Sequence, residues 1–188
     1  MKCQHCKKKI NHKILDLGHS PHSNAYIKEE DLKLSEKKYP LTIWVCNSCW
    51  LVQTEIFNVA SDLFNSEYSY FSGTSTSWLD HSYKYTELIS KKLNLNNKSF
   101  VIEIASNDGY LLKNFVNSNI PCLGIEPTEK TANESKKYGI DVIEEFFTEK
   151  LANQLSLKNK KADLLIGNNV FAHVPNINDF TNGMKIIL

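Results

Sequence analysis

The sequence predicts an α/β protein, with a parallel sheet that follows a small β-rich domain built around four cysteines. Two observations predict this fold class. From residue 98 onward, short apolar runs alternate with amphipathic stretches, which is typical of strand–helix units and a parallel sheet. Nearer the N-terminus, two Cys-x-x-Cys pairs flank a segment that is too small to hold itself together without a crosslink. We expect a first domain over residues 1–66, a connecting segment over 67–97 and the sheet domain over 98–188.

The cysteine pairs predict a structural zinc site. Cys3 with Cys6, and Cys46 with Cys49, each have two residues between them. One tight turn can therefore aim both thiolates of a pair at one point, and two such turns complete a tetrahedral site. Four cysteines leave no open position for water, so the expected Zn²⁺ is structural. The alternative, a pair of redox motifs, is disfavoured because neither pair opens a βαβ pattern. Cys122 lies in an apolar strand and is expected to be a core thiol.

Around the second pair, the segment "YPLTIWVCNSCWLVQTEI" alternates apolar and polar residues on both sides of the cysteines. This alternation predicts a β-hairpin whose turn carries Cys46 and Cys49.

The composition argues against nucleic acid and membrane partners. A formal net charge of +1 gives no electrostatic reason to expect either. No stretch approaches the ~18 apolar residues of a membrane span, and the N-terminus lacks the apolar core of a signal peptide. We therefore expect a cytoplasmic protein, in which the cysteines are ligands or core thiols rather than disulfides.

Four strand–helix units are predicted in the second half. The expected strands cover residues 99–105, 121–127, 140–147 and 161–170, and a helix follows each. Ligands of such folds bind at the carboxyl ends of the strands. The residues there are therefore candidate cofactor contacts: Glu103, Ala105, Asn107, Asp108, Gly109, Glu126, Pro127, Glu145, Phe146, Asn168 and Asn169.

These strand ends indicate a ligand that has a ribose and a base but no phosphates. Glu126 ends the second strand, where an acid can bind a pair of ribose hydroxyls. Glu145 and Phe146 end the third strand, and Phe146 could form a wall for the base. The strand ends show no cationic or glycine-rich cradle of the kind that a pyrophosphate needs. S-adenosylmethionine fits this description, and a dinucleotide does not.

The connecting segment combines an aromatic, hydroxyl-rich half with an amphipathic helix. The first half contains Tyr68 and Tyr70, and the second has apolar residues at helical spacing. An aromatic cluster before a helix can serve packing alone. Burying so many hydroxyls without partners is costly, however, so some of them are expected to face a polar ligand.

Several motifs occur in a characteristic order: the two cysteine pairs, then "YSYFSGTS", "EIASNDGYLL", "GIEP", "EEFF" and "NNVFAHVPNINDF". This series resembles the zinc-containing, S-adenosylmethionine-dependent C-methyltransferases that act on nucleotide-linked keto-deoxysugars, and the resemblance runs along essentially the whole chain. It implies a class I methyltransferase core with a Rossmann-like parallel sheet, preceded by a four-cysteine zinc domain. The sugar nucleotide would lie between the two.

The resemblance also implies a role for most of the candidate residues. Glu126 would hold the ribose and Phe146 would flank the adenine. The methionine end would be lined by turn residues: Ala105, Asn107 and Asp108. Three residues would face the sugar and act in catalysis: Tyr68, Tyr70 and His173. For His173, a helix cap or a core histidine is the alternative. A base would remove the sugar proton beside the keto group, and polar donors would stabilise the enolate oxygen.

Two departures from the family pattern qualify these expectations. The family core has seven strands and a catalytic Glu-His pair after the fifth, whereas this sequence ends at Leu188, in the helix after the fourth strand. We therefore expect the sheet to be incomplete at its C-terminal end, with little turnover by this chain alone and association through the open edge of the sheet. Ala105 stands where many relatives have glycine, which matters if its φ is positive.

Two other functions stay open. One is an O- or N-methyltransferase that acts on a sugar or an RNA, although the near-neutral charge disfavours RNA. The other is a non-catalytic module that binds zinc and the cofactor. The sequence does not identify the sugar nucleotide or the carbon that is methylated.

Overall fold

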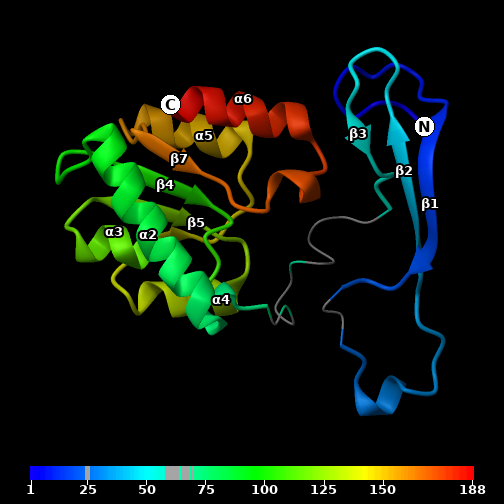
Figure 1. The fold of residues 1–188 in the computed structure, drawn as a ribbon, viewed down its shortest axis with the longest axis horizontal. Coiled ribbons are helices and arrows are strands. Elements are labelled where there is room, and N and C mark those ends of the chain that lie inside the picture. Colours follow the sequence, from blue (N-terminus) through cyan, green and yellow to red (C-terminus); the bar gives the residue numbers. More distant parts are fainter. Residues whose placement is uncertain (24–25, 58–63, 65–67, 69) are drawn as a thin grey trace. The chain divides into compact units, whose positions relative to one another are not determined.

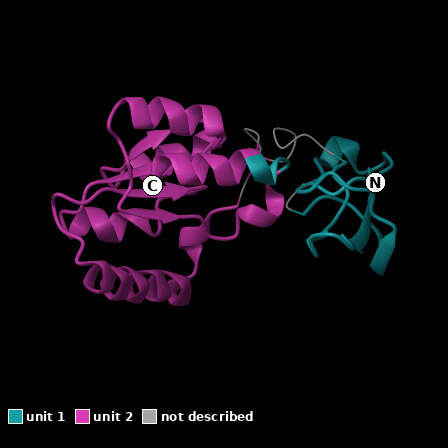
Figure 2. Ribbon diagram, turned by 90° about the horizontal axis from the view of Figure 1, so that it is seen from above, with its two compact units in different colours: residues 1–63, 175–178 teal, residues 64–174, 179–188 magenta. Residues whose placement is uncertain are grey.

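A computed structural model describes residues 1–23, 26–57, 64, 68 and 70–188 of the chain (Figure 1). The chain divides into two compact units (Figure 2). The N-terminal unit comprises Met1–Leu63 and Pro175–Asn178, and the parallel-sheet unit comprises Phe64–Val174 and Asp179–Leu188. Within the described residues, no helix is both long and apolar enough to cross a membrane.

The N-terminal unit is a three-stranded antiparallel sheet with very little core. Its strands are β1 (His12–Ser20), β2 (Tyr39–Val45) and β3 (Val52–Gln53), in the order β1-β2-β3. The turn between β2 and β3 carries Cys46 and Cys49, which confirms the predicted hairpin. Among the described residues of this unit, the buried apolar ones are Cys3, Ile10 and Cys46. Two of the three are thus cysteines of the predicted metal site.

The parallel-sheet unit contains the four predicted strands in the predicted order along the chain. They are β4 (Val101–Ile104), β5 (Cys122–Ile125), β6 (Asp141–Ile143) and β7 (Leu164–Ile166). They pair in the order β6-β5-β4-β7, and every pair is parallel. The chain moves outward from β4 to β6 and then returns to β7. This is the strand order of a Rossmann-like half, and its switch point lies between β4 and β7.

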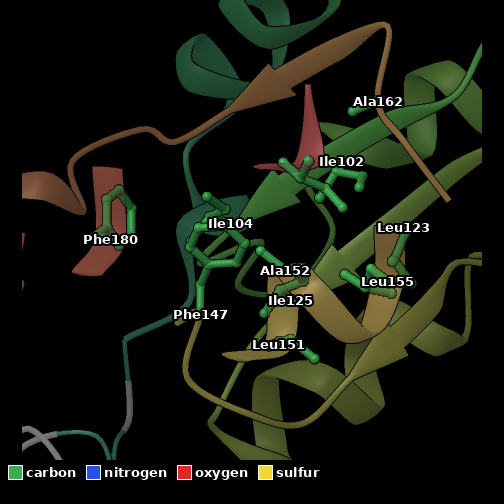
Figure 3. Close-up of a cluster of buried hydrophobic side chains, with 11 residues drawn as sticks. Ile102, Ile104, Leu123, Ile125, Phe147, Leu151, Ala152, Leu155, Ala162 and Phe180 are labelled. Carbon is green, nitrogen blue, oxygen red and sulfur yellow. The ribbon is translucent and has the colours of Figure 1, made fainter. Parts of the chain in front are cut away.

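Helices cover both faces of this sheet. They are α2 (Thr76–Leu93), α3 (Leu112–Asn117), α4 (Glu129–Lys136), α5 (Glu149–Leu157) and α6 (Ile177–Ile187). Successive residues of β4 point to opposite faces. Val101 packs in a cluster with residues of α2 and α3, whereas Ile102 and Ile104 pack with residues of α5 and α6 (Figure 3). Both faces of β4 are therefore buried, as expected for a central strand.

β7 forms one edge of the sheet as far as the described residues show, because it pairs with β4 alone. Unpaired backbone groups along a partly apolar edge favour association with another chain. We therefore expect the average molar mass of the isolated 188-residue chain to rise with concentration in light scattering. A monodisperse monomer over the whole range would contradict this prediction.

Candidate functional site

The four cysteines of the N-terminal unit converge on one point. All four Sγ atoms lie within 4.8 Å of one another, and the Cys3–Cys49 and Cys6–Cys46 sulfur pairs are each 3.5 Å apart. A tetrahedral zinc ion with Zn–S bonds of about 2.3 Å requires sulfur separations of roughly 3.8 Å. The cluster therefore has the composition and spacing of a structural zinc site, as predicted.

Both cysteine turns have the same backbone geometry. The Lys7 N–H donates to the Cys3 carbonyl over 3.1 Å, and the Trp50 N–H donates to the Cys46 carbonyl over 2.8 Å. The donor residues have φ of 62° and 64°, a left-handed conformation that side chains disfavour. Each turn therefore contains one residue in a strained conformation. The geometry of the turn directs two thiols to the same point.

Gln53 supports the cysteine cluster and was missed by the sequence reasoning. Its Nε2 donates to Cys3 Sγ over 3.5 Å, and its Oε1 accepts from the Gln4 N–H over 2.8 Å. Burial alone would raise the pKa of Cys3, but hydrogen bonds from Gln53 and from the backbone N–H groups of Cys6 and His5 lower it to about 6. The thiolate is the form that binds a metal. The signal available in the sequence was a glutamine directly after the apolar residues that follow the second cysteine pair.

The turn after β4 has an unusual backbone. Ala105, Asn107 and Gly109 have φ of 56°, 50° and 75°. Ala105 therefore occupies a position that suits glycine, at a cost of roughly 1–2 kcal/mol. A Cβ at Gly109 would lie 2.6 Å from Ser135 Oγ and 2.7 Å from Ile140 Cδ1. Gly109 is therefore required for packing of the turn beside α4, whatever it contributes to a ligand.

Glu126 accepts hydrogen bonds from backbone groups that follow two neighbouring strands, β4 and β5. The carboxylate is buried, its Oε2 accepts from the Asn107 N–H over 2.9 Å, and its Oε1 accepts from the Thr128 N–H over 2.9 Å. A carboxylate offers about four acceptor positions. Two of them thus remain for other donors, such as the hydroxyls of a ribose.

Glu103 is the most unusual group of the site. It is fully buried in β4, and neither of its carboxylate oxygens has a hydrogen-bond partner among the residues that the structure describes. Burial raises the pKa of Glu103 well above its usual range, and the charges of Glu126 and Asp108 raise it further. Asp108 Oδ1 is also buried, with no hydrogen-bond partner in the described part of the chain. Three acids are thus gathered with several unused acceptor positions.

The side chains of Asn107 and Asp108 bind backbone groups of the segment before α2. Asn107 Oδ1 accepts from the Ser72 N–H over 2.9 Å, and Asn107 Nδ2 donates to the Tyr70 carbonyl over 3.1 Å. Asp108 Oδ2 accepts from the Gly73 N–H over 2.8 Å. Both side chains were expected to line the methionine end of the cofactor. In the structure, both side chains form hydrogen bonds with the protein itself.

An aromatic cluster around Phe64 brings together three predicted site residues. Its ring centroid lies 5.2 Å from that of Tyr68, 6.5 Å from that of Phe146 and 6.4 Å from that of His173. Burial, with the charge of Glu126 second, raises the pKa of Tyr68. The predicted adenine wall and two of the predicted catalytic residues are therefore neighbours. Phe64 itself was missed, because nothing in "LFNSEY" distinguishes it from a core residue.

The remaining candidates are more exposed to solvent than Glu103 and Glu126. Glu145, Asn168 and Asn169 are exposed and Pro127 is partly buried. Asn168 Nδ2 donates to the Tyr110 hydroxyl over 3.4 Å. Burial raises the pKa of Tyr110 to about 12, with the charge of Glu103 as the second cause. Tyr110 was not predicted, although its place directly after the turn was a usable signal. Tyr70 is half exposed.

Comparison with known proteins supports this description. Residues 3–64 match the family model described as "Putative zinc binding domain". The chain is 26% identical over 175 residues to the C-methyltransferase NovU of Streptomyces niveus, which covers 93% of this chain and 41% of that protein. The chain thus spans less than half the length of this relative. These two matches confirm the predicted resemblance to zinc-containing C-methyltransferases.

Two solved structures are also similar to this chain. One is a SAM-dependent methyltransferase from Anabaena variabilis, with a TM-score of 0.46 and 18% identity, over 56% of this chain and 46% of that one. The other is the plantazolicin methyltransferase BamL, with a TM-score of 0.42 and 22% identity, over 60% of this chain and 47% of that one.

Proposed function

We propose that this chain is the zinc-binding and cofactor-binding part of an S-adenosylmethionine-dependent C-methyltransferase. The proposed substrate is a nucleotide-linked keto-deoxysugar, methylated beside its keto group. The proposal is supported by the similarity to a C-methyltransferase along 93% of the chain. It is also supported by the acidic site at the carboxyl ends of β4 and β5.

The acidic site is the observation that carries the choice of cofactor. Glu103, Asp108 and Glu126 are all buried, and none of them takes part in an ion pair among the described residues. Buried carboxylates are costly unless they are paired with positive charge. S-adenosylmethionine carries an ammonium and a sulfonium group, so its binding would provide that charge. A pyrophosphate would add negative charge to the same place.

In this proposal, each side chain of the site contacts a different part of the cofactor. Glu126 would accept from the ribose hydroxyls through its two remaining acceptor positions, and Phe146 would contact the adenine. Glu103 and Asp108 attract the positive end of the cofactor. The bound cofactor supplies the methyl group that is transferred.

The residues around Phe64 would act on the sugar. An ordinary tyrosine, with a pKa of about 10, is protonated at neutral pH, and burial raises the pKa of Tyr68 further. Its hydroxyl therefore suits donation to the enolate oxygen. The imidazole of His173 is a base that can accept a proton. Both rings lie against Phe64, which supports a shared role at one substrate.

The test is methyl transfer by the complete enzyme of which this chain is proposed to be a part, because little turnover is expected from the chain alone. The acceptors are a panel of nucleotide-linked keto sugars, and the methyl donor is ¹³C-labelled S-adenosylmethionine. We expect the sugar to gain one methyl group, and the ¹³C spectrum to show that group bonded to carbon. A methyl group on oxygen or nitrogen would favour the other methyltransferase classes. Labelling of RNA in place of every sugar would overturn the proposed substrate class.

A further inference from the structure

A short strap, residues 70–74, is fastened to the turn after β4. Three hydrogen bonds hold it: the Ser72 N–H to Asn107 Oδ1, Asn107 Nδ2 to the Tyr70 carbonyl, and the Gly73 N–H to Asp108 Oδ2. All three join strap backbone to a side chain of the turn. The strap is therefore held by two residues that lie 35 or more positions away in the sequence.

The attachment is close-packed. Asn107 is 8% exposed and Asp108 is 6% exposed. A Cβ at Gly73 would lie only 2.8 Å from Asp108 Oδ2, so that no other residue fits there without a shift. The strap leads directly into Ser75, whose Oγ accepts from the Trp78 N–H at the start of α2. Its two ends are thus tied to the turn and to a long helix.

Asn107 connects the strap to the acid that is proposed to hold the ribose. Its side chain binds the strap on both sides of Phe71, and its own N–H donates to Glu126 Oε2 over 2.9 Å. A ligand that fixes Glu126 would therefore also restrict Asn107 and, through its side chain, the strap. Because such coupling is reciprocal, an ordered strap also favours the bound ligand.

We propose that Asn107 and Asp108 are positioning residues that couple cofactor binding to the order of the strap, and so to the placement of Tyr70. This inference rests on the proposed function. It gives a reason for Asn-Asp at this turn: their side chains hold a second segment, which glycine could not do.

The backbone of Asn107 allows a clean test. Its φ of 50° is a conformation that glycine adopts without strain. Asn107→Gly therefore keeps the turn and the N–H to Glu126, and removes only the two side-chain bonds to the strap. Asn107→Asp is the conservative variant, which keeps an acceptor for Ser72 and loses the donor to Tyr70. Asn159→Gly is the matched control, because Asn159 is an exposed residue with φ of 55° outside the site.

The measurement is hydrogen exchange of residues 70–75 with and without S-adenosylhomocysteine, with binding followed in parallel by calorimetry. In the wild type and in Asn159→Gly, we expect the ligand to slow exchange of the strap by about fivefold or more, the lower range of site-to-site coupling. In Asn107→Gly the ligand should still bind while the strap loses this response. Asn107→Asp should keep part of it.

The possible failures are distinguishable. Absence of binding heat in the wild type would overturn the proposed function, and this inference with it. Binding without slower strap exchange in the wild type would overturn the inference alone. If Asn107→Gly does not fold, the same comparison is made with Asn107→Asp, and a full response there, equal to that of the wild type, would also contradict the coupling.

Discussion

Removal of zinc, or the substitution Cys46→Ser, is expected to unfold the N-terminal unit while the sheet of β4–β7 stays folded. In the part of that unit that the structure describes, the buried apolar residues are Cys3, Ile10 and Cys46, and β1 is exposed along almost its whole length. Structural zinc contributes about 10–16 kcal/mol to the folding of small zinc domains. The apolar core is too small to replace a contribution of that size.

Elemental analysis of protein purified without chelator should find one zinc ion per chain. Hydrogen exchange should then show loss of protection in β1–β3 on chelation, with β4 still protected. Cys122→Ser is the control, because Cys122 lies in β5, outside the cluster, and its zinc content should equal that of the wild type. A chain without zinc, or a hairpin that stays protected after chelation, would refute the structural role of the metal.

Glu103→Gln is expected to stabilise the ligand-free protein and to weaken S-adenosylmethionine binding. The folded-state pKa of Glu103 is raised above its unfolded value, because burial and the neighbouring charges of Glu126 and Asp108 disfavour the carboxylate. The stability that the protonated form provides is therefore present at low pH and is lost as the pH rises through the raised pKa. Glutamine never ionises, so the variant avoids this loss.

At alkaline pH we expect the variant to gain roughly 1–3 kcal/mol of unfolding free energy over the wild type, the order of cost for one unsatisfied buried group. At mildly acid pH the gain should be small. Thermal unfolding at both pH values measures this, with Glu129→Gln, an exposed acid of α4, as the control. The same pH dependence in wild type and variant would show that Glu103 does not carry an unpaired charge.

The cofactor affinity should show the opposite trend. Positive charge on the ligand favours the ionised form of Glu103. S-adenosylmethionine should therefore bind the wild type more tightly as the pH rises, and the dependence should flatten in Glu103→Gln. The residue would thus reduce the stability of the empty site and contribute to binding when the site is filled.

The sequence allowed the elements of both units to be predicted, because their signals are local. The alternation around Cys46 and Cys49 is contained in one hairpin, and each strand–helix unit of the sheet shows its own period. The convergence of the cysteine pairs could also be predicted, since a shared metal explains two such turns better than a pair of redox motifs does.

The finer structure of the site could not be predicted, because it depends on contacts between distant segments. Asn107 and the strap are 35 residues apart, and Gln53 and Cys3 are 50 apart. The positive φ of Ala105 could not be predicted either, because an alanine in the sequence does not indicate a left-handed backbone conformation. Candidate residues such as Glu126 could be named because they end a strand whose limits were visible in the sequence.

Titration of S-adenosylhomocysteine into the wild type and Glu126→Ala tests most directly whether the cofactor binds at the ends of β4 and β5. We expect the variant to lose roughly 1.5–3 kcal/mol of binding free energy, the range for a hydrogen bond to a charged group. Glu129→Ala, an exposed acid three positions further on, should bind as the wild type does. Because Glu126 also accepts from Asn107 and Thr128, thermal unfolding must show that the variant is folded. A folded Glu126→Ala with unchanged affinity would place the cofactor elsewhere and contradict the proposed site.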